Sequence, residues 1–359
     1  MSPYDPDGAE LITMKTPSKS GTPIATLTMN PALDITTDTD RVIPTDKMRC
    51  GPPRYDPGGG GINVARIAHV LGAAVSALFP AGGHAGDKVT DLVADCGVPV
   101  ERINVARSTR ESFTIDERST GQQFRFVLPG PQLTDAEQTE CLDKLSATAE
   151  SADLVVASGS LPPGVPADFY QRVARICDER GARLILDTSG AGLRHIISGV
   201  FLLKPSVREL RECVQRPLVN ESEQLTAAHE LVHRGCTQFV VVSLGSQGAL
   251  LATPDGSQRY SPVTVPSGSG VGAGDAMVAG ITVGLSRGWQ LEKAVRLGVA
   301  AGAAMLLTPG TAPCTRPDVE RFFEMVADPI DIDAPTPGDG ERRSDTADQW
   351  LSARAWTTP

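Results

Sequence analysis

Short, continuous apolar runs separated by helical patterns constrain this chain most strongly. A run without alternation is typical of a strand buried on both faces, and parallel strands need a long crossover between them. Helical patterns at 167–179 and 221–234 supply such crossovers. The sequence therefore predicts an α/β domain of three layers, with a central, mostly parallel sheet between two layers of helices. The runs are Ile24–Met29, Asp153–Ser158, Arg183–Asp187, Val200–Lys204 and Phe239–Ser243.

Two segments break this rhythm with alternating apolar and polar residues. Residues 36–55 and 102–126 contain strings such as SFTIDE and QQFRFVL. Alternation is typical of strands with one packed face and one wet face. We therefore expect a small antiparallel β lid over the main domain.

The ends of the chain differ in composition from its middle. Residues 1–23 and 328–359 are rich in Pro, Ser, Gly and charge, which predicts a disordered N-terminal arm and a disordered tail. The folded domain then covers 24–327, with apolar residues at 40% of the chain. The longest apolar stretch, 299–307, is too short to cross a bilayer, and the N-terminus lacks the apolar core of a signal peptide.

Charge and cysteine usage exclude several classes of protein. The formal net charge of −10 argues against nucleic acid or an anionic membrane as the main partner. Seven cysteines are scattered, without metal-site spacing, which indicates small buried residues in a reducing compartment. We therefore predict a cytoplasmic protein with small-molecule ligands.

The strongest motif is SGSGVGAGDAMVAGITVGL at 267–285. Gly272, Ala273 and Gly274 open an amphipathic helix, whose free N–H groups and dipole favour an anion. Asp275 follows in the first turn and can accept a proton from a hydroxyl beside that anion. The pattern fits phosphoryl transfer. The simpler alternative is that Asp275 caps the helix and the glycines form a tight turn.

Two commoner nucleotide motifs fail on spacing. A dinucleotide fingerprint G-x-G-x-x-G requires glycine at 275 or 277, which are Asp275 and Met277, or at 63 or 64, which are Asn63 and Val64. A phosphate-binding loop of the Walker type requires a Gly-Lys pair, and the sequence contains none.

Two further motifs suit a polyhydroxy ligand. In DPGGGGINVARIAHVLG (56–72), glycines permit close backbone approach, and Asn63 can donate and accept hydrogen bonds. In NPALD (30–34), Asp34 ends a strand and can grip neighbouring hydroxyls. A capped flexible turn and a plain turn residue are the alternatives.

Weaker signals gather at the ends of other strands. Ser160 in SGSLPPG, Lys204 and Glu209 in KPSVREL, and the turn in SLGSQGA each follow an apolar run. Each alone is an ordinary loop, but open α/β sheets bind ligands at this edge. Four basic residues lie in or near the lid segments and either form a solvated edge or clamp a phosphate. They are Lys47, Arg49, Arg54 and Arg110.

Taken together, these strings resemble the phosphofructokinase B branch of the ribokinase-like carbohydrate kinases, nearest to the minor 6-phosphofructokinase type. TLTMNPALD, PGGGGINVA, FPAGG, STRESFTI, FRFVLPG, SGSLPPG, SLGSQGALL and VGAGDAMV occur in the family's order across about residues 24–325. Gly60 favours this type, because fructose-1-phosphate and tagatose-6-phosphate kinases usually have lysine there.

The resemblance implies ATP and Mg²⁺ as cofactors, K⁺ as a monovalent cation, and a homodimer formed through the lid. It implies Asp275 as the general base, with Gly272, Ala273 and Gly274 as its anion hole. The implied sugar-phosphate ligands are Asp34, Lys47, Arg49, Gly59, Gly60, Asn63, Arg110 and Ser160. The implied nucleotide-site residues are Lys204, Ser206, Ser243, Gly245, Gly248, Ser267, Val299 and Ala303. The implied metal-site residues are Glu209 for magnesium, through water, and Ser269, Val271, Met305, Thr308 and Gly310 for the monovalent cation.

One departure from the family pattern concerns magnesium. The family usually has Asn-x-x-Glu after the Lys-Pro pair, and this chain has Ser206 before Glu209.

The expected activity is phosphorylation of fructose 6-phosphate by ATP, in glycolysis. The alternatives are a tagatose-6-phosphate kinase, a 1-phosphofructokinase, or a sugar-phosphate sensor with weak or no catalysis.

Overall fold

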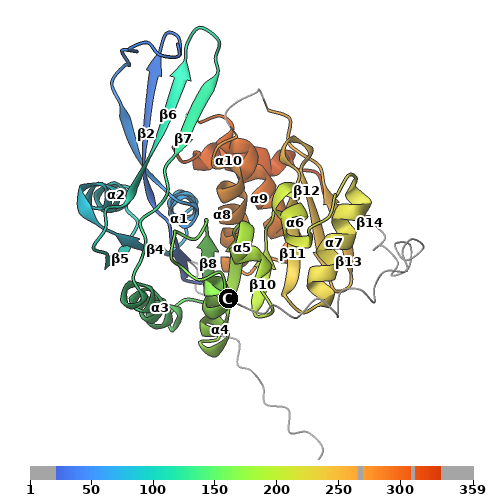
Figure 1. The fold of residues 1–359 in the computed structure, drawn as a ribbon. Coiled ribbons are helices and arrows are strands. Elements are labelled where there is room, and N and C mark those ends of the chain that lie inside the picture. The colour runs from blue at the N-terminus through green and yellow to red at the C-terminus, as the bar shows by residue number, and fades with distance from the viewer. Residues whose placement is uncertain (1–21, 266–269, 309–311, 333–359) are drawn as a thin grey trace, which may run out of the picture.

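The computed structural model describes residues 22–265, 270–308 and 312–332. Its main sheet has ten strands in the order β14-β13-β12-β11-β10-β9-β8-β1-β4-β5 (Figure 1). The seven strands from β11 to β5 pair in parallel, and the other three extend one edge antiparallel. In chain order the strands are β1 Ile24–Leu27, β4 Val75–Ala81, β5 Val100–Asn104, β8 Leu154–Ser158, β9 Arg183–Asp187, β10 Val200–Leu203, β11 Thr237–Ser243, β12 Ala249–Thr253, β13 Gly256–Tyr260 and β14 Ile330–Ile332.

Helices cover both faces of this sheet, which confirms the predicted three layers (Figure 1). In β8, Leu154 and Val156 pack into one core with α1, α8 and α9, while Val155 and Ala157 pack into the other with α3, α4 and α7. The helices are α1 Gly60–Val70, α2 Gly83–Asp95, α3 Asp135–Ala149, α4 Phe169–Glu179, α5 Gly190–Arg194, α6 Val207–Val214, α7 Glu221–His233, α8 Ala273–Ser286, α9 Leu291–Met305 and α10 Arg316–Met325.

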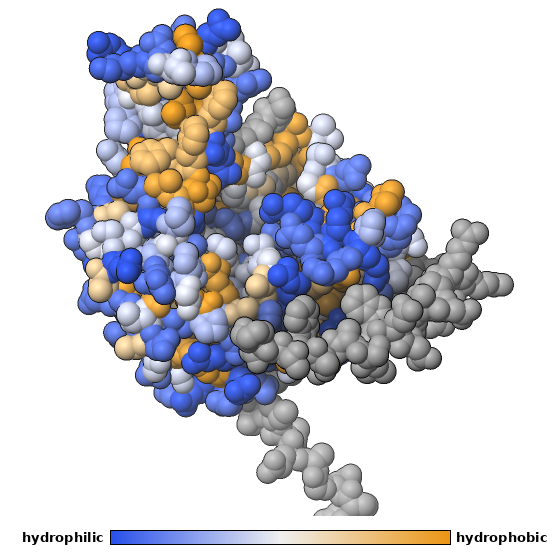
Figure 2. All heavy atoms as spheres, viewed as in Figure 1, coloured by the Kyte–Doolittle hydropathy of each residue, from blue (hydrophilic) through white to orange (hydrophobic). Residues whose placement is uncertain are grey.

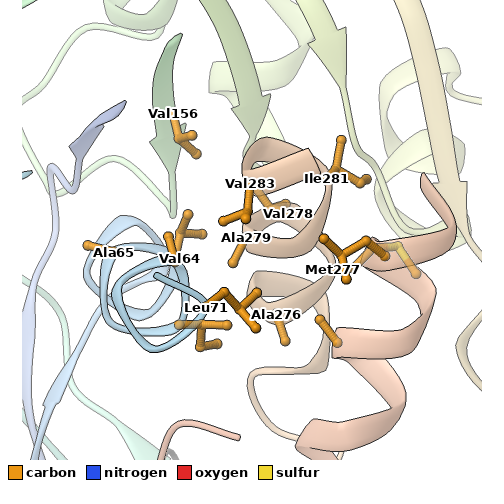
Figure 3. Packing of buried hydrophobic residues seen from close by; sticks show 14 of the residues in the cluster. Val64, Ala65, Leu71, Val156, Ala276, Met277, Val278, Ala279, Ile281 and Val283 are labelled. Atoms are coloured by element: carbon orange, nitrogen blue, oxygen red, sulfur yellow. The ribbon is translucent and has the colours of Figure 1, made fainter. Parts of the chain in front are cut away.

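Small residues let α1, α8 and α9 approach one another closely. A Cβ atom at Gly280 of α8 would lie 2.6 Å from the Leu297 carbonyl oxygen of α9, so only glycine fits there. On the other side of α8, Val64 of α1 packs beside Ala279 in the same core (Figure 3). This packing places the first turns of α1 and α8 next to each other.

The lid is a second sheet of four strands in the order β3-β2-β6-β7 (Figure 1). The β2–β3 and β6–β7 pairs are antiparallel, but the central β2–β6 pair is parallel, so the lid is not purely antiparallel as predicted. The predicted bounds were also wrong at 102–104, because β5 joins the main sheet and covers these residues. The lid strands are β2 Ala32–Thr39, β3 Arg54–Gly58, β6 Arg110–Glu117 and β7 Gln123–Val127.

The domain extends beyond both predicted boundaries. Residues 330–332 form β14 and pair with β13, so the tail predicted from residue 328 begins later. The Thr22 N–H donates to the Ser286 carbonyl at 2.9 Å, which ties down a residue assigned to the arm. Residues 1–21 of the predicted arm and 333–359 of the predicted tail lie outside the described residues.

Two other predictions concern the whole chain. Within the described ranges, no helix is both long and apolar enough to cross a membrane. All seven cysteines are described and none is paired, yet Cys50 is exposed, so the prediction of buried cysteines does not hold at that position.

Candidate active site

The predicted base and the predicted sugar ligand Asn63 meet at the junction of α1 and α8. The Asn63 amide donates to a carboxylate oxygen of Asp275, with 2.9 Å between Nδ2 and Oδ2. The other amide atom of Asn63, Oδ1, is buried and has no hydrogen-bond partner among the described residues. A buried acceptor without a partner is costly, which marks this spot as a place for a ligand hydroxyl.

Backbone N–H groups open toward the same spot from the first turn of α8. Gly272, the N-cap residue, has φ 78°, a conformation that suits glycine, and it has no side chain with which to cap the helix. Within the described segments, no hydrogen bond is found for the N–H groups of Gly274 and Asp275, while the Ala273 N–H meets the Gly270 carbonyl at 3.3 Å. Open amides at a helix N-terminus form an anion site.

Burial raises the pKa of Asp275 from 3.8 to about 7. The carboxylates of Asp187 and Glu209 contribute to this rise, whereas the Asn63 amide and the Lys204 ammonium oppose it. A carboxyl group with a pKa near neutrality is suited to accept a proton and release it again.

The Lys204 ammonium lies at the centre of a group of carboxylates. It forms a buried ion pair with Asp187, 3.2 Å from Nζ to Oδ1, and it lies 3.5 Å from the Cβ position of Gly274. Burial alone would lower the pKa of Lys204, but the carboxylates of Asp187, Glu209 and Asp275 outweigh burial and raise it. The lysine therefore stays charged beside the anion site.

Ser206 and Glu209 form a reciprocal cap at the start of α6. The Ser206 N–H and hydroxyl both donate to Glu209 Oε2, each at 2.8 Å, and the Glu209 N–H donates to Ser206 Oγ at 3.3 Å. Ser206 also forms a bridge with Ser243 at the end of β11. The cap fixes the Glu209 carboxylate at the edge of the sheet that carries Lys204.

The glycine run at 58–61 lies against the ends of β1 and β8. A Cβ atom at Gly60 would lie 2.2 Å from Ser158 Oγ, and one at Gly59 would lie 2.5 Å from a methyl group of Thr28. Gly59 also has φ 119°. This segment therefore has no room for side chains, while the predicted close approach of its backbone to a ligand stays a prediction.

On the lid side, the predicted ligands Asp34 and Arg110 interact electrostatically with each other. The Arg110 guanidinium donates to the carbonyls of Leu128 and Asn30 at 3.2 and 3.1 Å. Burial raises the pKa of Asp34 to about 6, and the charge of Arg110 opposes this rise. The Asn30 amide donates to Ser160 Oγ at 3.2 Å, which connects the β1 loop with the β8 loop.

Several predicted site residues are not brought together with this cluster. Lys47 and Arg49 are exposed in the segment that joins β2 and β3, and in the described ranges their side chains make no hydrogen bond or ion pair. Val299 and Ala303 are buried in α9, and Gly245 is exposed in the turn after β11. Gly248 has φ 96°, and a Cβ atom there would lie 2.1 Å from the Tyr260 carbonyl oxygen.

The predicted monovalent-cation residues are only partly described. Ser269 and Gly310 lie outside the described residues, as does Ser267 of the nucleotide set. The Met305 carbonyl accepts hydrogen bonds from the Thr308 N–H and hydroxyl at 3.1 and 2.9 Å. Both lone pairs of this carbonyl are thus engaged, so an ion bound there would have to displace one Thr308 bond.

Sequence reasoning missed two polar residues of the site. Asp187 ends β9 and pairs with Lys204, and Asn30 orients Ser160. Both residues stand immediately after buried apolar runs, which is the signal that identified Lys204 and Ser160. Asp187 was included in its strand as RLILD, and its position at the carboxyl end of that strand could have placed it in the site.

The fold and the site together define a ribokinase-like sugar kinase. A ribokinase from Arabidopsis thaliana has the same fold, with a TM-score of 0.67 over 85% of this chain, at 21% identity. The family model for pfkB family carbohydrate kinases matches residues 27–318, and the chain belongs to this family.

Close relatives carry the same name in two bacteria. The chain is 68% identical, over 86% of its length and 91% of the relative's, to the ATP-dependent 6-phosphofructokinase isozyme 2 of Mycobacterium tuberculosis. It is 40% identical to the protein of that name from Escherichia coli, over 85% of this chain and 99% of the relative. A structure of E. coli phosphofructokinase-2 in complex with fructose-6-phosphate matches 85% of this chain and 99% of that chain, at 38% identity and TM-score 0.80.

The raised pKa of Asp275 predicts a pH-dependent effect on stability. The unfolded carboxyl ionises near pH 3.8 and the folded one near 7, so its ionisation opposes folding increasingly across this window, and fully above it. Asp275→Asn, which cannot ionise, should therefore raise the melting temperature more at pH 8 than at pH 5. Asp143→Asn, an exposed substitution on α3, is the control. Equal effects of Asp275→Asn at both pH values would contradict this account.

Proposed function

We propose that the protein transfers the γ-phosphoryl group of ATP to O1 of fructose 6-phosphate, giving ADP and fructose 1,6-bisphosphate. The observation that carries this proposal is the Asn63–Asp275 hydrogen bond at the open N-terminus of α8. It places a carboxylate of near-neutral pKa beside an anion site, which is what phosphoryl transfer to a hydroxyl requires.

In this mechanism Asp275 accepts the proton of the O1 hydroxyl as O1 forms its bond to the γ-phosphorus. The bond from that phosphorus to the bridging oxygen breaks, and ADP leaves with the electron pair. The open N–H groups of Gly274 and Asp275 stabilise the charge on the transferring group. Lys204, held by Asp187, neutralises charge on the phosphates from the other side.

The donor set suits a magnesium ion held through water. Asp187, Glu209 and Asp275 surround one lysine, so the cluster has an excess of negative charge. In the described part of the chain, no three acidic, His or Cys side chains lie close enough to hold a metal directly. Mg²⁺ keeps several waters and takes phosphate oxygens as ligands, and it would supply charge neutralisation during transfer. Glu209, fixed by its cap, is the residue we expect to face those waters.

The glycine at position 60 supports fructose 6-phosphate as the acceptor. The related 1-phosphofructokinases and tagatose-6-phosphate kinases are expected to have lysine there, and here a Cβ atom would lie within 3.0 Å of the backbone at 158 and 159. A longer side chain would require the β8 loop to move. The packing at this position therefore requires glycine at residue 60.

ADP release measured with a panel of hexose phosphates tests this function directly. We expect the highest kcat/KM with fructose 6-phosphate, above fructose 1-phosphate and tagatose 6-phosphate. Asp275→Asn should lower kcat by about 10²–10⁴-fold without loss of ATP binding, because only the proton acceptor is removed. A preference for another acceptor would refute the assignment, and near-normal turnover in Asp275→Asn would refute the mechanism.

The serine at position 206 predicts a weakened hold on hydrated magnesium. Its hydroxyl is committed to the Glu209 cap, whereas an asparagine could cap the helix and still present an N–H₂ group. Ser206→Asn should therefore lower the magnesium concentration for half-maximal rate, by up to about 10-fold, as expected for an outer-shell partner. The KM for the acceptor should change little.

Ser206→Thr, which keeps the hydroxyl cap, is the matched control for that substitution. It should leave the magnesium titration unchanged. If the titrations of the wild type and Ser206→Asn also superimpose, serine already serves the metal as well as asparagine would, and the prediction is wrong.

We further propose that two chains associate through their lids. Tyr55, Ile35, Phe113 and Phe126 stand in one row across β3, β2, β6 and β7, on the opposite face from Asp34. Tyr55, Phe113 and Phe126 are 42%, 37% and 50% exposed, and Figure 2 shows apolar residues at the lid surface. An exposed apolar row on a sheet is typical of an interface. Lys47 and Arg49 of each chain would then approach the sugar site of the other.

Light scattering tests the lid interface. The wild type should be a dimer or a larger assembly that contains one, and Phe113→Glu should dissociate it, because a buried charge would have no partner. Val219→Glu replaces an apolar residue that is 81% exposed outside the lid and should leave the assembly intact. A wild type that is monomeric and fully active would rule the interface out.

A further inference from the structure

A cavity of about 280 Å³ lies between the C-terminal ends of α5, α6 and α7. Its floor is aliphatic, because Leu193, Ile196, Leu203 and Leu231 line it and all four are buried. These residues belong to the core shared with α3 and α4, whereas α8 packs into the core on the opposite face of the main sheet. The cavity is therefore separate from the site around Asp275.

The rim of this cavity is polar and positively charged. Arg194 ends α5, Arg234 follows the last residue of α7, and both are exposed lining residues. Gln215, at the C-cap of α6, is also exposed and lines the cavity. No aspartate or glutamate of the described residues lines the cavity. In a chain with a net charge of −10, two arginines without an acidic residue beside them form a local positive site.

The donors of these two arginines are not used by the protein. Within the described ranges, neither guanidinium makes a hydrogen bond or an ion pair. Glu230 lies one turn before Arg234 on α7, but its carboxylate is held by Arg216, which donates to both of its oxygens at 2.8 and 2.6 Å. Each rim arginine thus keeps its fork of donors, and such a fork matches a carboxylate or a phosphate.

The charges of both arginines reach the inside of the cavity, where the thiols of Cys213 and Cys236 lie. Burial raises the pKa of Cys213 and Cys236 adds to this rise, whereas Arg234 and then Arg194 oppose it. Burial also raises the pKa of Cys236, and Arg234 again opposes the rise. The two guanidinium groups therefore act on one enclosed space and not only on the solvent outside it.

We infer that this cavity is a second binding site, for a small organic anion: a carboxylate or a phosphate monoester with a short apolar chain. Arg194 and Arg234 would hold the anionic group at the rim, and the aliphatic floor would take the chain. A few polar groups above an apolar floor are typical of small-molecule sites. At about 30 Å³ for each water, the cavity has room for about nine water-sized groups, which suits a six-carbon chain with its anionic head. The inference goes beyond the proposed function, which uses none of these residues.

Titration calorimetry of the full chain tests the inference with two probes, hexanoate and monohexyl phosphate. At least one of them should bind, and which of them binds distinguishes a carboxylate ligand from a phosphate ligand. The matched controls are 1-hexanol, which lacks the charge, and acetate and inorganic phosphate, which lack the chain. None of the three should show binding that depends on Arg234 as tightly as the better probe does.

Arg194→Gln and Arg234→Gln locate the binding in the cavity, because the two arginines come from different helices. Each substitution should weaken binding of the better probe by about 10- to 100-fold, as for a lost charge-assisted hydrogen bond. The rate of ADP release with the sugar-phosphate acceptor should stay unchanged in both variants. Arg211→Gln is the matched control, since Arg211 is exposed on α6 and does not line the cavity, and it should leave the affinity unchanged.

Three results would overturn the inference. The first is that neither hexyl anion binds. The second is that either cavity substitution weakens binding by less than tenfold, which would place the probe elsewhere, including in the active site. The third is that a control probe shows Arg234-dependent binding as tight as that of the hexyl anion, because the charge and the chain would then not both be recognised.

Discussion

The contact between the first turns of α1 and α8 is the constraint on which the rest of the site depends. It brings Asn63 to 2.9 Å from Asp275, and glycine at position 280 lets α9 pack closely against the same helix. One helix supplies the carboxylate and the open amides, and the other supplies the amide that holds the carboxylate in place. Both helices pack into one core beside β8, so side-chain packing sets this geometry.

Sequence alone predicted most of the main domain, for a clear physical reason. Strands buried on both faces, such as β8 and β9, read as unbroken apolar runs, and the glycines before α8 mark its start. The lid was predicted less accurately. Alternation shows that a strand has one wet face, but it does not show whether the partner strand runs parallel or antiparallel. The strands β2 and β6 are far apart in the sequence, and only the fold shows that they pair in parallel.

The residues of the candidate site also differ in how far the sequence alone predicts them. Asp275, Asn63 and Asp34 stand in distinctive motifs and could be identified from their neighbours. The position of Asp187 at the end of an apolar run could indicate the same edge of the sheet, but only the fold shows that it lies 3.2 Å from Lys204. The pKa of about 7 for Asp275 likewise depends on burial and on distant carboxylates, which no local pattern reveals.

The short strand β14 has a consequence for where the domain can be cut. Its three residues cover the edge of β13. Two residues that precede β14 are held by Arg296 of α9, which donates to the Asp328 carboxylate at 2.6 Å and to the Val326 carbonyl at 2.7 Å. A chain ended at residue 327 would lose the strand and the ion pair together. It would leave the backbone of β13 free to pair with other chains, and an uncovered strand edge promotes aggregation. Solubility of the isolated domain thus depends on residues that carry no catalytic group.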